Sequence, residues 1–570
     1  MLAHLDCTAA LFTAGRRLFA GLPGRHIFSM TCAFALVRWR VMGFLELTDV
    51  AFALPGGWTL FEGATFRVPE GEHAALVGAN GRGKTTLLSL IAGEERPTAG
   101  SIRVDGRVGL MRQFIGDDDA TVRDFLLAYS DRPVRQAADR VAAAETRLNA
   151  GDHGERAQLA YADTLAAWEQ AGGYRTEVLW DRCAHSAFGG GYPESADRRI
   201  DTLSGGERKR LALEVIFAGP FDVILLDEPD NTLDIEGKTW LEDKILACAE
   251  TLLFVSHDRT VLDRAATRIV TLEGRQTWTH HGPYATYAEA RDARLDRLDE
   301  QHRRYQERHA QIEAYMKEMK RKAAYNDAFA SKARDAVKKL ARFEERETPP
   351  EKPAVQDVKM RIDGGRTGKV AFRATGLSIA GLVLPFDTEF RFGERIGVIG
   401  PNGTGKTHFL RLLAGDDVAH QGEWKLGARV EPALFAQLHD GLDVGDRAIG
   451  EVLSKKGLDR SRTMSTLRRY ELDHVATNPF SLLSGGQQAR FQILLMEIDS
   501  PTMLLLDEPT DNLDVASADA LEEALARYAG TVVAVTHDRW FMRTMDRFLS
   551  FDADGTVREL LESPYDLAVR

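Results

Sequence analysis

Residues 78–86 read GANGRGKTT, and residues 400–408 read GPNGTGKTH. Both fit the pattern GxxxxGK followed by Thr, in which glycines let backbone N–H groups close around phosphates ahead of a helix. Three further motifs follow each stretch in the same order: LSGGE, VILLDEP and SHD at residues 203–207, 223–229 and 256–258, then LSGGQ, MLLLDEP and THD at residues 483–487, 503–509 and 536–538. Four motifs that recur in one order indicate two copies of one nucleotide-binding domain.

The spacing between the copies shows an insertion as well as a duplication. Ser204 and Ser484 are 280 residues apart, whereas Gln113 and Gln437 are 324 residues apart. Because 324 exceeds 280 by 44, the first copy carries 44 additional residues between Gln113 and Ser204. We expect two helices there, at residues 133–149 and 155–171, around a break at residues 151–154.

Length and charge limit the classes of protein to consider. A chain of 570 residues suggests two domains of roughly 200 to 250 residues with attachments. The net charge of −12 argues against a protein that coats nucleic acid with its whole surface, so any such contact needs a local patch. The cysteines have no metal-ligand spacing and are expected to stay reduced: Cys7, Cys32, Cys183 and Cys248.

The N-terminal stretch is separate from the first domain. Residues 1–41 carry five arginines against one acidic residue, a balance also found in targeting peptides. Their longest apolar run, residues 30–37, is under half of the ~20 residues that a membrane-spanning helix needs. The strand-like run FLELTDVAF begins at Phe44. We therefore expect residues 1–41 to be a dispensable extension, either disordered or the product of an upstream start.

The motifs supply the chemistry that a bound triphosphate requires. Lys84 and Lys406 are expected to reach the β- and γ-phosphates, and Thr85 and Thr407 to ligate Mg²⁺. The apolar runs 223–226 and 503–506 predict buried parallel strands that end in the metal-binding residues Asp227 and Asp507. Glu228 and Glu508 follow directly and are placed to polarise the attacking water. The expected nucleotide contacts of the two loops are Gly78, Asn80, Gly81, Gly83, Lys84, Thr85 and Thr86, and Gly400, Asn402, Gly403, Gly405, Lys406, Thr407 and His408.

The LSGGE and LSGGQ motifs, with the histidines of SHD and THD, make the chain resemble an ATP-binding-cassette (ABC) protein. This resemblance implies that the signature of one cassette closes on the nucleotide held by the other: Ser204, Gly205 and Gly206 on the Lys406 site, and Ser484, Gly485 and Gly486 on the Lys84 site. It also implies that His257 and His537 hold the γ-phosphate, that Gln113 and Gln437 sense the metal, and that Asp234 and Asp514 lie in loops at the cassette seam. The family's adenine-stacking aromatic is missing, since Leu54 and Ile379 occupy those places. Either Trp58 replaces it in the first cassette or stacking is dispensed with.

The segment between the cassettes is basic and free of helix breakers. Residues 284–348 contain neither Gly nor Pro, but one straight helix of that length would span about 100 Å, so we expect an antiparallel hairpin broken near residues 325–327. Residues 317–342 hold nine basic and three acidic residues, with aromatics among them. That composition suits phosphate contacts and base stacking on RNA, although a solvated linker helix would look alike. The residues expected to bind RNA are Lys317, Lys320, Arg321, Lys322, Lys332 and Arg334.

This layout resembles the ABC-F proteins, twin-cassette ATPases with a helical-hairpin linker and no membrane domain. The resemblance spans roughly residues 44 to 555 and implies that the hairpin enters the ribosomal exit-tRNA site and reaches toward the peptidyl-tRNA. It also implies a helical arm in the first cassette that contacts the ribosome, although a simple packing insertion stays open. Regulation of elongation, rescue of stalled ribosomes and protection from ribosome-targeting antibiotics share these motifs.

The sequence thus predicts an α/β protein with two tandem ABC-type P-loop ATPase domains joined by a long α-helical hairpin linker. We expect a cytoplasmic ATPase that uses ATP and Mg²⁺, binds the ribosome through rRNA, tRNA and ribosomal proteins, does not insert into membranes, and is monomeric with an intramolecular cassette dimer. The alternative is the ATP-binding subunit of a membrane ABC transporter. The expected divisions are 1–41 (extension), 42–283 (first cassette, with the arm at 131–171), 284–350 (hairpin) and 351–570 (second cassette).

Overall fold

The computed structural model describes residues 43–565 except 113–119, 348, 350–352, 354–355, 357, 437–444 and 446. The extension expected at residues 1–41 lies outside the described residues. So do Gln113 and Gln437, the two expected metal sensors.

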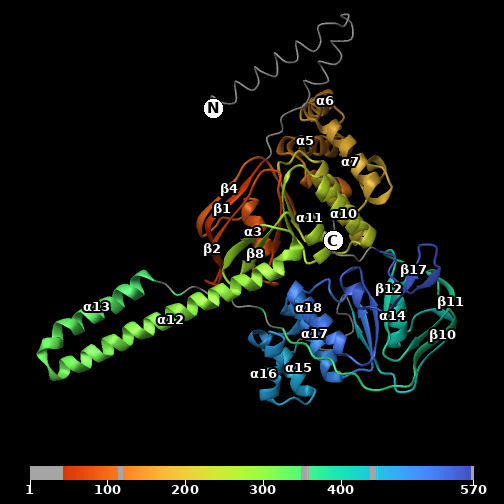
Figure 1. Cartoon of the computed structure of the whole chain (residues 1–570). Helices are drawn as coiled ribbons and strands as arrows, with labels where there is room; N and C mark the ends of the chain where they lie inside the picture. The colour runs from red at the N-terminus through yellow and green to blue at the C-terminus, as the bar shows by residue number, and fades with distance from the viewer. Residues whose placement is uncertain are drawn as a thin grey trace, which may run out of the picture. The chain divides into compact units, whose positions relative to one another are not determined.

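The first cassette is built on two sheets (Figure 1). One has six strands in the order β5-β6-β7-β3-β8-β9, and the other has three in the order β2-β1-β4. Every residue of β3, β6 and β7 is buried, as expected of parallel strands covered on both faces. The strands are β1 (Leu45–Ala53), β2 (Thr59–Val68), β3 (His73–Val77), β4 (Ala99–Val104), β5 (Val108–Met111), β6 (Val223–Asp227), β7 (Thr251–Val255), β8 (Arg268–Glu273) and β9 (Gln276–His280).

The helices of the first cassette include the pair expected from the insertion, which the structure places at α5 and α6. Trp168 of α6 is buried and lies 6.5 Å from the Trp180 ring of α7, so the pair is packed onto the cassette core. The helices are α3 (Lys84–Ile91), α4 (Val122–Ala128), α5 (Arg132–Asn149), α6 (Glu155–Gln170), α7 (Gly173–Phe188), α8 (Tyr192–Ser195), η1 (Ile200–Thr202), α9 (Gly205–Ala218), α10 (Ile235–Ala247) and α11 (Arg259–Ala265).

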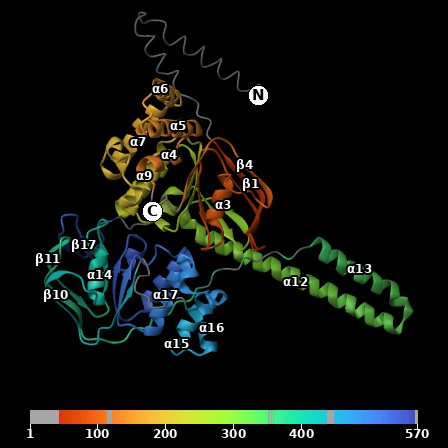
Figure 2. The same ribbon diagram turned by 180° about the vertical axis from the view of Figure 1, so that it is seen from behind.

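The linker forms the expected helical hairpin. After the turn η2 (Tyr284–Thr286), α12 (Tyr287–Tyr325) ends at the predicted break, and η3 (Asp327–Phe329) leads into α13 (Ala330–Arg346). The two helices lie side by side in Figure 1 and Figure 2. Tyr305 stacks on Phe343 at 5.2 Å between ring centroids, and Met319 is buried against Ala333 and Ala336. Apolar contacts along the pair therefore hold the hairpin closed.

The second cassette repeats both sheets, in the orders β11-β10-β13 and β14-β15-β16-β12-β17-β18. Its strands are β10 (Val370–Ile379), β11 (Val383–Arg391), β12 (Arg395–Ile399), β13 (His420–Leu426), β14 (Pro432–Phe435), β15 (Met503–Asp507), β16 (Thr531–Val535), β17 (Arg547–Phe551) and β18 (Val557–Leu560). Its helices are α14 (Lys406–Ala414), α15 (Ile449–Lys455), α16 (Arg460–Arg469), η4 (Asp473–Val475), η5 (Phe480–Leu482), α17 (Gly485–Asp499), α18 (Val515–Arg527) and η6 (Phe541–Thr544).

Each six-stranded sheet has a core on both faces, and this positions the nucleotide site. In β6, Ile224 and Leu226 belong to one core while Val223 and Leu225 belong to the other. Such a strand has no solvated face, so its polar residue, Asp227, is delivered at the carboxyl end where ligands bind in α/β sheets. In the described part of the chain, no helix is both long and apolar enough to cross a membrane.

Candidate nucleotide-binding sites

The two Gly-rich loops have backbone conformations that favour glycine. Gly81 and Gly83 have φ of 76° and 93°, and Gly403 and Gly405 have φ of 82° and 94°. At Gly400 (φ 136°) a Cβ atom would also collide with the backbone oxygen of Phe551. The loops are therefore fixed in a shape that other residues adopt only at a cost in strain.

Each loop ends at the N-terminus of a helix whose first residue is the expected phosphate-binding lysine. The Nζ atom of Lys84 donates to the backbone oxygens of Gly78 (2.8 Å) and Ala79 (3.3 Å) and to Oδ1 of Asn80 (3.3 Å). That of Lys406 donates to the backbone oxygens of Gly400 and Pro401, at 2.8 and 2.7 Å. Both ammonium groups thus lie inside the loops, where a triphosphate would be cradled.

The expected catalytic glutamates are strained, and Glu508 is buried whereas Glu228 is half-buried. Glu228 and Glu508 both adopt positive φ, 48° and 47°, directly after β6 and β15. A non-glycine residue keeps a positive φ only where the surrounding structure holds it in that conformation. Such residues cluster at functional sites. Burial, and then the Asp227 carboxylate, raises the pKa of Glu228 to about 7, and burial with Asp511 raises that of Glu508 to about 8. Carboxyls poised near neutrality suit general-base chemistry.

The histidines of SHD and THD lie beside these glutamates. His257 Nε2 is 3.9 Å from Glu228 Oε1, and His537 Nε2 is 3.5 Å from Glu508 Oε1. Burial, and then the nearby Lys84 ammonium, lowers the pKa of His257 to about 3, so the ring is neutral at physiological pH. A neutral imidazole offers one donor and one acceptor to a phosphate and its surroundings.

The residues expected to hold Mg²⁺ fit an oxygen-ligand site. Burial raises the pKa of the Asp227 carboxyl, and a hydrogen bond from the neighbouring Thr85 hydroxyl opposes the shift. Burial likewise raises the pKa of the Asp507 carboxyl, and a hydrogen bond from the Thr407 hydroxyl opposes that shift. The described residues contain no group of three or more His, Cys, Asp and Glu side chains able to hold a metal ion. A hydroxyl and a carboxylate per site suit Mg²⁺, which takes its remaining ligands from phosphates and water.

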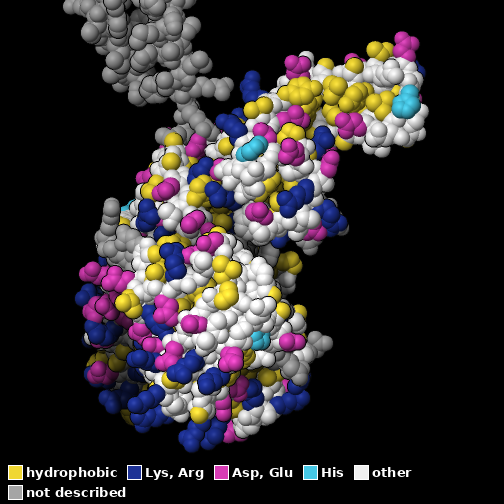
Figure 3. Space-filling model, turned by 90° about the vertical axis from the view of Figure 1, so that its right-hand side faces the viewer, with side chains coloured by type: hydrophobic (Ala, Val, Ile, Leu, Met, Phe, Trp, Pro, Cys, Tyr) yellow, Lys and Arg dark blue, Asp and Glu magenta, His cyan; other side chains and the backbone are white. Residues whose placement is uncertain are grey.

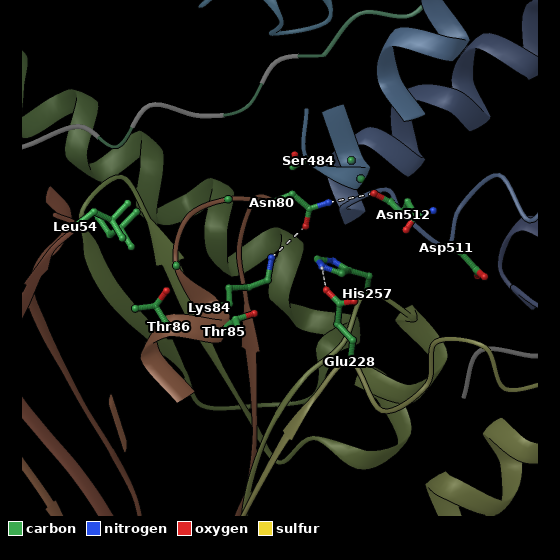
Figure 4. A pocket seen from close by; sticks show the side chains of 15 residues that line it. Leu54, Asn80, Lys84, Thr85, Thr86, Glu228, His257, Ser484, Asp511 and Asn512 are labelled. Atoms are coloured by element: carbon green, nitrogen blue, oxygen red, sulfur yellow. Dashed lines mark hydrogen bonds and ion pairs between the residues drawn. The ribbon is translucent and has the colours of Figure 1, made fainter. Parts of the chain in front are cut away.

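Residues of both cassettes line the first site. A cavity of about 390 Å³ is bounded by Lys84, Glu228 and His257 and, from the second cassette, by Ser484 and Asn512 (Figure 4). Gly485 and Gly486 also line it, as do Asn80, Gly81, Gly83, Thr85 and Thr86. Its volume is typical of a small-molecule site. The structure thus brings the second signature onto the first phosphate loop, the arrangement expected from the resemblance.

The second site shares one cross-cassette hydrogen bond with the first but has a different cavity. Asn402 donates through Nδ2 to the backbone oxygen of Thr232 (3.2 Å), and a Cβ atom on Gly206 would lie 4.0 Å from the same Nδ2. A cavity of about 950 Å³ is lined by Thr407, His408 and Asp507, but not by Ser204 or Gly205. Lys406 and Glu508 are both buried. The two sites are therefore not identical in this structure.

Aliphatic side chains line both cavities. Leu54 and Leu60 line the first cavity, and Ile379 and Leu382 line the second. Trp58 lines neither cavity and is 73% exposed. Leucine can cover a base through apolar contact without stacking a ring on it.

Both signature serines cap the helices that follow them. Ser204 and Ser484 precede α9 and α17, and each forms a capping box, with Glu207 and Gln487 respectively. A serine with a Glu or Gln three residues later is the usual sequence signal for this cap. The caps fix the start of each signature helix, and hence the direction of its N-terminus.

Two residues that bind Glu228 were not predicted from the sequence. Asn231 donates from Nδ2 to Glu228 Oε2 (2.6 Å), and Lys209 of α9 donates from Nζ to the Glu228 backbone oxygen (2.5 Å). Lys209 is buried among the apolar residues of α9. The sequence shows only that a lysine lies within an otherwise apolar helical face. This pattern does not indicate which group the lysine binds.

The hairpin tip presents its basic residues to solvent. All six residues expected to bind RNA are exposed: Lys317, Lys320, Arg321, Lys322, Lys332 and Arg334. Two of them flank the Phe329 ring, at 5.9 Å (Lys322) and 5.5 Å (Lys332), and Tyr325 is 89% exposed. Elsewhere, on the face drawn in Figure 3, Lys and Arg side chains are interspersed with Asp and Glu. The basic tip is thus a local feature of an acidic chain.

Comparison with known proteins agrees with this architecture. A family model described as ABC transporter matches residues 61–231 and 384–511, and a second model of the same description matches residues 270–360. The chain is 46% identical to an antibiotic resistance protein of Mycobacteroides abscessus over 91% of this chain and 99% of that protein. It is 30% identical to ABC transporter F family member 5 of Arabidopsis thaliana, over 88% of this chain and 74% of that one. The chain belongs to the ABC-F family.

Another ABC-F relative is named for a role in translation. The energy-dependent translational throttle protein of Mycobacterium tuberculosis is 30% identical over 88% of this chain and 90% of its own length. The predicted resemblance is therefore confirmed, and this ABC-F chain is an ATPase that converts ATP to ADP and phosphate.

Proposed function

We propose that this ABC-F ATPase acts on the ribosome, with the hairpin entering the exit-tRNA site and contacting RNA. The observation that carries the proposal is the tip of the hairpin, where six basic side chains are exposed, two of them beside the Phe329 ring, and Tyr325 is also exposed, in a chain of net charge −12. Basic groups contact phosphates and aromatic rings stack on unpaired bases. The relative named as a translational throttle supports translation as the process.

In this proposal ATP closes the two cassettes, and hydrolysis releases them. Lys84 and Lys406 bind the phosphates, Glu228 and Glu508 accept a proton from the attacking water, and His257 and His537 contact the γ-phosphate. The signature residues Ser204 to Gly206 and Ser484 to Gly486 complete each other's sites. Mg²⁺, held by Thr85 with Asp227 and by Thr407 with Asp507, would neutralise charge on the phosphates. The free energy of ATP binding therefore drives closure only when the two cassettes meet.

We divide the chain at the limits predicted from the sequence, with cassettes at 42–283 and 351–570 and the hairpin at 284–350. The arm at 131–171 is proposed to contact ribosomal protein rather than RNA, because its acids outnumber its basic residues. A single polypeptide supplies both halves of each site, so we propose a monomer. A ribosome-acting role also places it in the cytoplasm.

Protection from ribosome-targeting antibiotics is the role we favour among those of the family. The relative with 46% identity over 91% of this chain is named an antibiotic resistance protein. The physical route would be a hairpin tip that displaces a drug, or reshapes its site, by contacting RNA nearby.

Sedimentation with ribosomes tests the proposal. The wild-type chain should pellet with ribosomes in ATP and less in ADP, because only ATP closes the cassettes. The chain expressed in a susceptible bacterium should also raise the inhibitory concentration of a ribosome-targeting antibiotic. Absence of pelleting in either nucleotide, together with co-purification of a membrane protein, would instead favour a transporter subunit.

A further inference from the structure

Lys238 of α10 is a buried lysine that reaches from the first cassette into the second. Only 5% of the residue is exposed. Its Nζ atom lies 3.0 Å from Asp258 Oδ2 within its own cassette, and donates to the backbone oxygen of His537 across the seam at 3.3 Å. Burial disfavours its charge, but the carboxylates of Asp258, Asp511 and Asp230 outweigh that and raise its pKa. Lys238 is therefore a buried cation that depends on acceptors from both cassettes.

The contact has no counterpart on the other side of the pseudo-twofold seam. Residues 280 positions apart are equivalent in the two cassettes, and the equivalent of Lys238 is Ala518, which has no polar side-chain atom. By contrast, an arginine–glutamate ion pair between the cassettes does repeat. Arg539 pairs with Glu242 of α10, and Arg259 pairs with the equivalent Glu522 of α18 at 3.0 Å. The lysine is thus an asymmetric addition to a symmetric set of ion pairs.

Lys238 holds the backbone of a residue that itself holds the catalytic group of the second site. The backbone N–H of His537 donates to Glu508 Oε2 at 3.0 Å, and its ring Nε2 lies 3.2 Å from Asn402 Oδ1 in the phosphate loop. In the first site, Glu228 Oε2 accepts from the side chain of Asn231, a residue of the same cassette. Glu508 is therefore bonded to a residue whose carbonyl oxygen Lys238 of the opposite cassette binds, and Ala518, at the position equivalent to Lys238, cannot bind His257 in this way.

We propose that Lys238 is a positioning residue for the second nucleotide site alone, so that hydrolysis at Glu508 depends on a cross-cassette contact that hydrolysis at Glu228 does not use. The inference rests on the catalytic roles proposed above for the two glutamates. Closure of the cassettes would bring Lys238 onto His537 and fix the His537–Glu508 pair. Opening would remove one acceptor from a buried cation and release that pair. The chain would then couple closure to hydrolysis more tightly at one site than at the other.

The test measures each site separately. Glu228→Gln leaves only the second site able to hydrolyse, and Glu508→Gln leaves only the first. Into each background we would introduce Lys238→Met, which keeps the length of the side chain and removes its charge and donors. The first turnover of radiolabelled ATP, at concentrations that fill both sites, is then followed by rapid quenching.

We expect Lys238→Met to slow the first turnover at least 10-fold in the Glu228→Gln background, and less than twofold in the Glu508→Gln background. The ATP concentration for half-maximal rate should change less than twofold in both. Lys238→Arg should restore most of the lost rate. Lys244→Met on the same helix is the control, because Lys244 pairs with Glu214 inside the first cassette (2.8 Å).

Equal losses in the two backgrounds would mean that Lys238 only stabilises the seam, and would overturn the proposal. An unchanged rate at the second site, or no rescue by arginine, would overturn it as well. The Glu228→Gln and Glu508→Gln double variant separates this outcome from a failure of the proposed catalytic roles. If that double variant still hydrolyses ATP, the glutamate assignment is wrong, whatever Lys238 does.

Discussion

Asn80, in the first phosphate loop, donates a hydrogen bond from Nδ2 to the backbone oxygen of Asn512 in the second cassette, at 3.1 Å. Its equivalent, Asn402, donates in the same way to Thr232 of the first cassette at 3.2 Å. Two equivalent amides, each reaching from a phosphate loop across the seam, thus link nucleotide binding to cassette closure at both sites.

Replacing these amides should weaken closure more than nucleotide binding. A hydrogen bond of this kind contributes about 0.5–1.5 kcal/mol, so Asn80→Ala or Asn402→Ala should shift the ATP-driven closure equilibrium roughly 2- to 13-fold. Energy transfer between dyes on the two cassettes measures closure. Arg82→Ala is the control within the same loop, and a loss of closure as large as that of Asn80→Ala would argue against the amide link.

Removing both catalytic carboxyls should separate ATP binding from hydrolysis. Glu228→Gln with Glu508→Gln leaves the loops and lysines intact, so nucleotide affinity should stay within a few-fold of wild type. Hydrolysis should fall by roughly 10²- to 10⁴-fold, the contribution typical of a general base. The closed chain should then inhibit translation when it is expressed. Phosphate release and nucleotide binding, assayed together, check this, and turnover at the wild-type rate would refute the assignment.

Reversing charge at the hairpin tip should weaken ribosome binding and reduce its salt dependence. Lys317, Lys320, Arg321 and Lys322, all changed to Glu, would remove up to four phosphate contacts, each of which releases about 0.7–0.9 counterions. The slope of log affinity against log salt should become less steep by about 3 units, while ATPase activity without ribosomes stays near wild type. The measurement is pelleting across a salt series in ATP.

A matched control for the tip uses the same helix and the same change in charge. Four exposed arginines nearer the base of α12 serve: Arg297, Arg303, Arg304 and Arg308, each changed to Glu. This variant should lose less affinity than the tip variant. Equal losses would show that the whole helix contributes through long-range charge and that the tip has no special role.

The two described cysteines should differ in reactivity. Burial, and then the Glu214 carboxylate, raises the pKa of the Cys183 thiol to about 11, so almost none of it is thiolate at pH 8. Because the thiolate is the reactive form, Cys183 should react with a maleimide at least 10-fold more slowly than the half-buried Cys248. The rate at Cys183 should rise as the pH approaches 11. Peptide mass spectrometry follows both sites, and equal rates in native protein would contradict the burial.

The sequence determined the two cassettes and most of each cassette's own site. Gly-rich loops, an aspartate after an apolar strand and a capped signature helix are local patterns, because each depends on backbone conformation within a few residues. The break of the linker helix at residues 325–327 was likewise predictable, since Asn and Asp interrupt a run free of Gly and Pro.

Only the tertiary structure decided which residues meet across the seam. Lys238 and the His537 backbone are 299 positions apart, and nothing in their spacing predicts a contact that exists only when two domains dock. The same holds for Leu54, which lines the first cavity while Trp58, four residues later, faces solvent. Such contacts depend on how two rigid surfaces are oriented, and orientation is a property of packing that local sequence patterns do not encode.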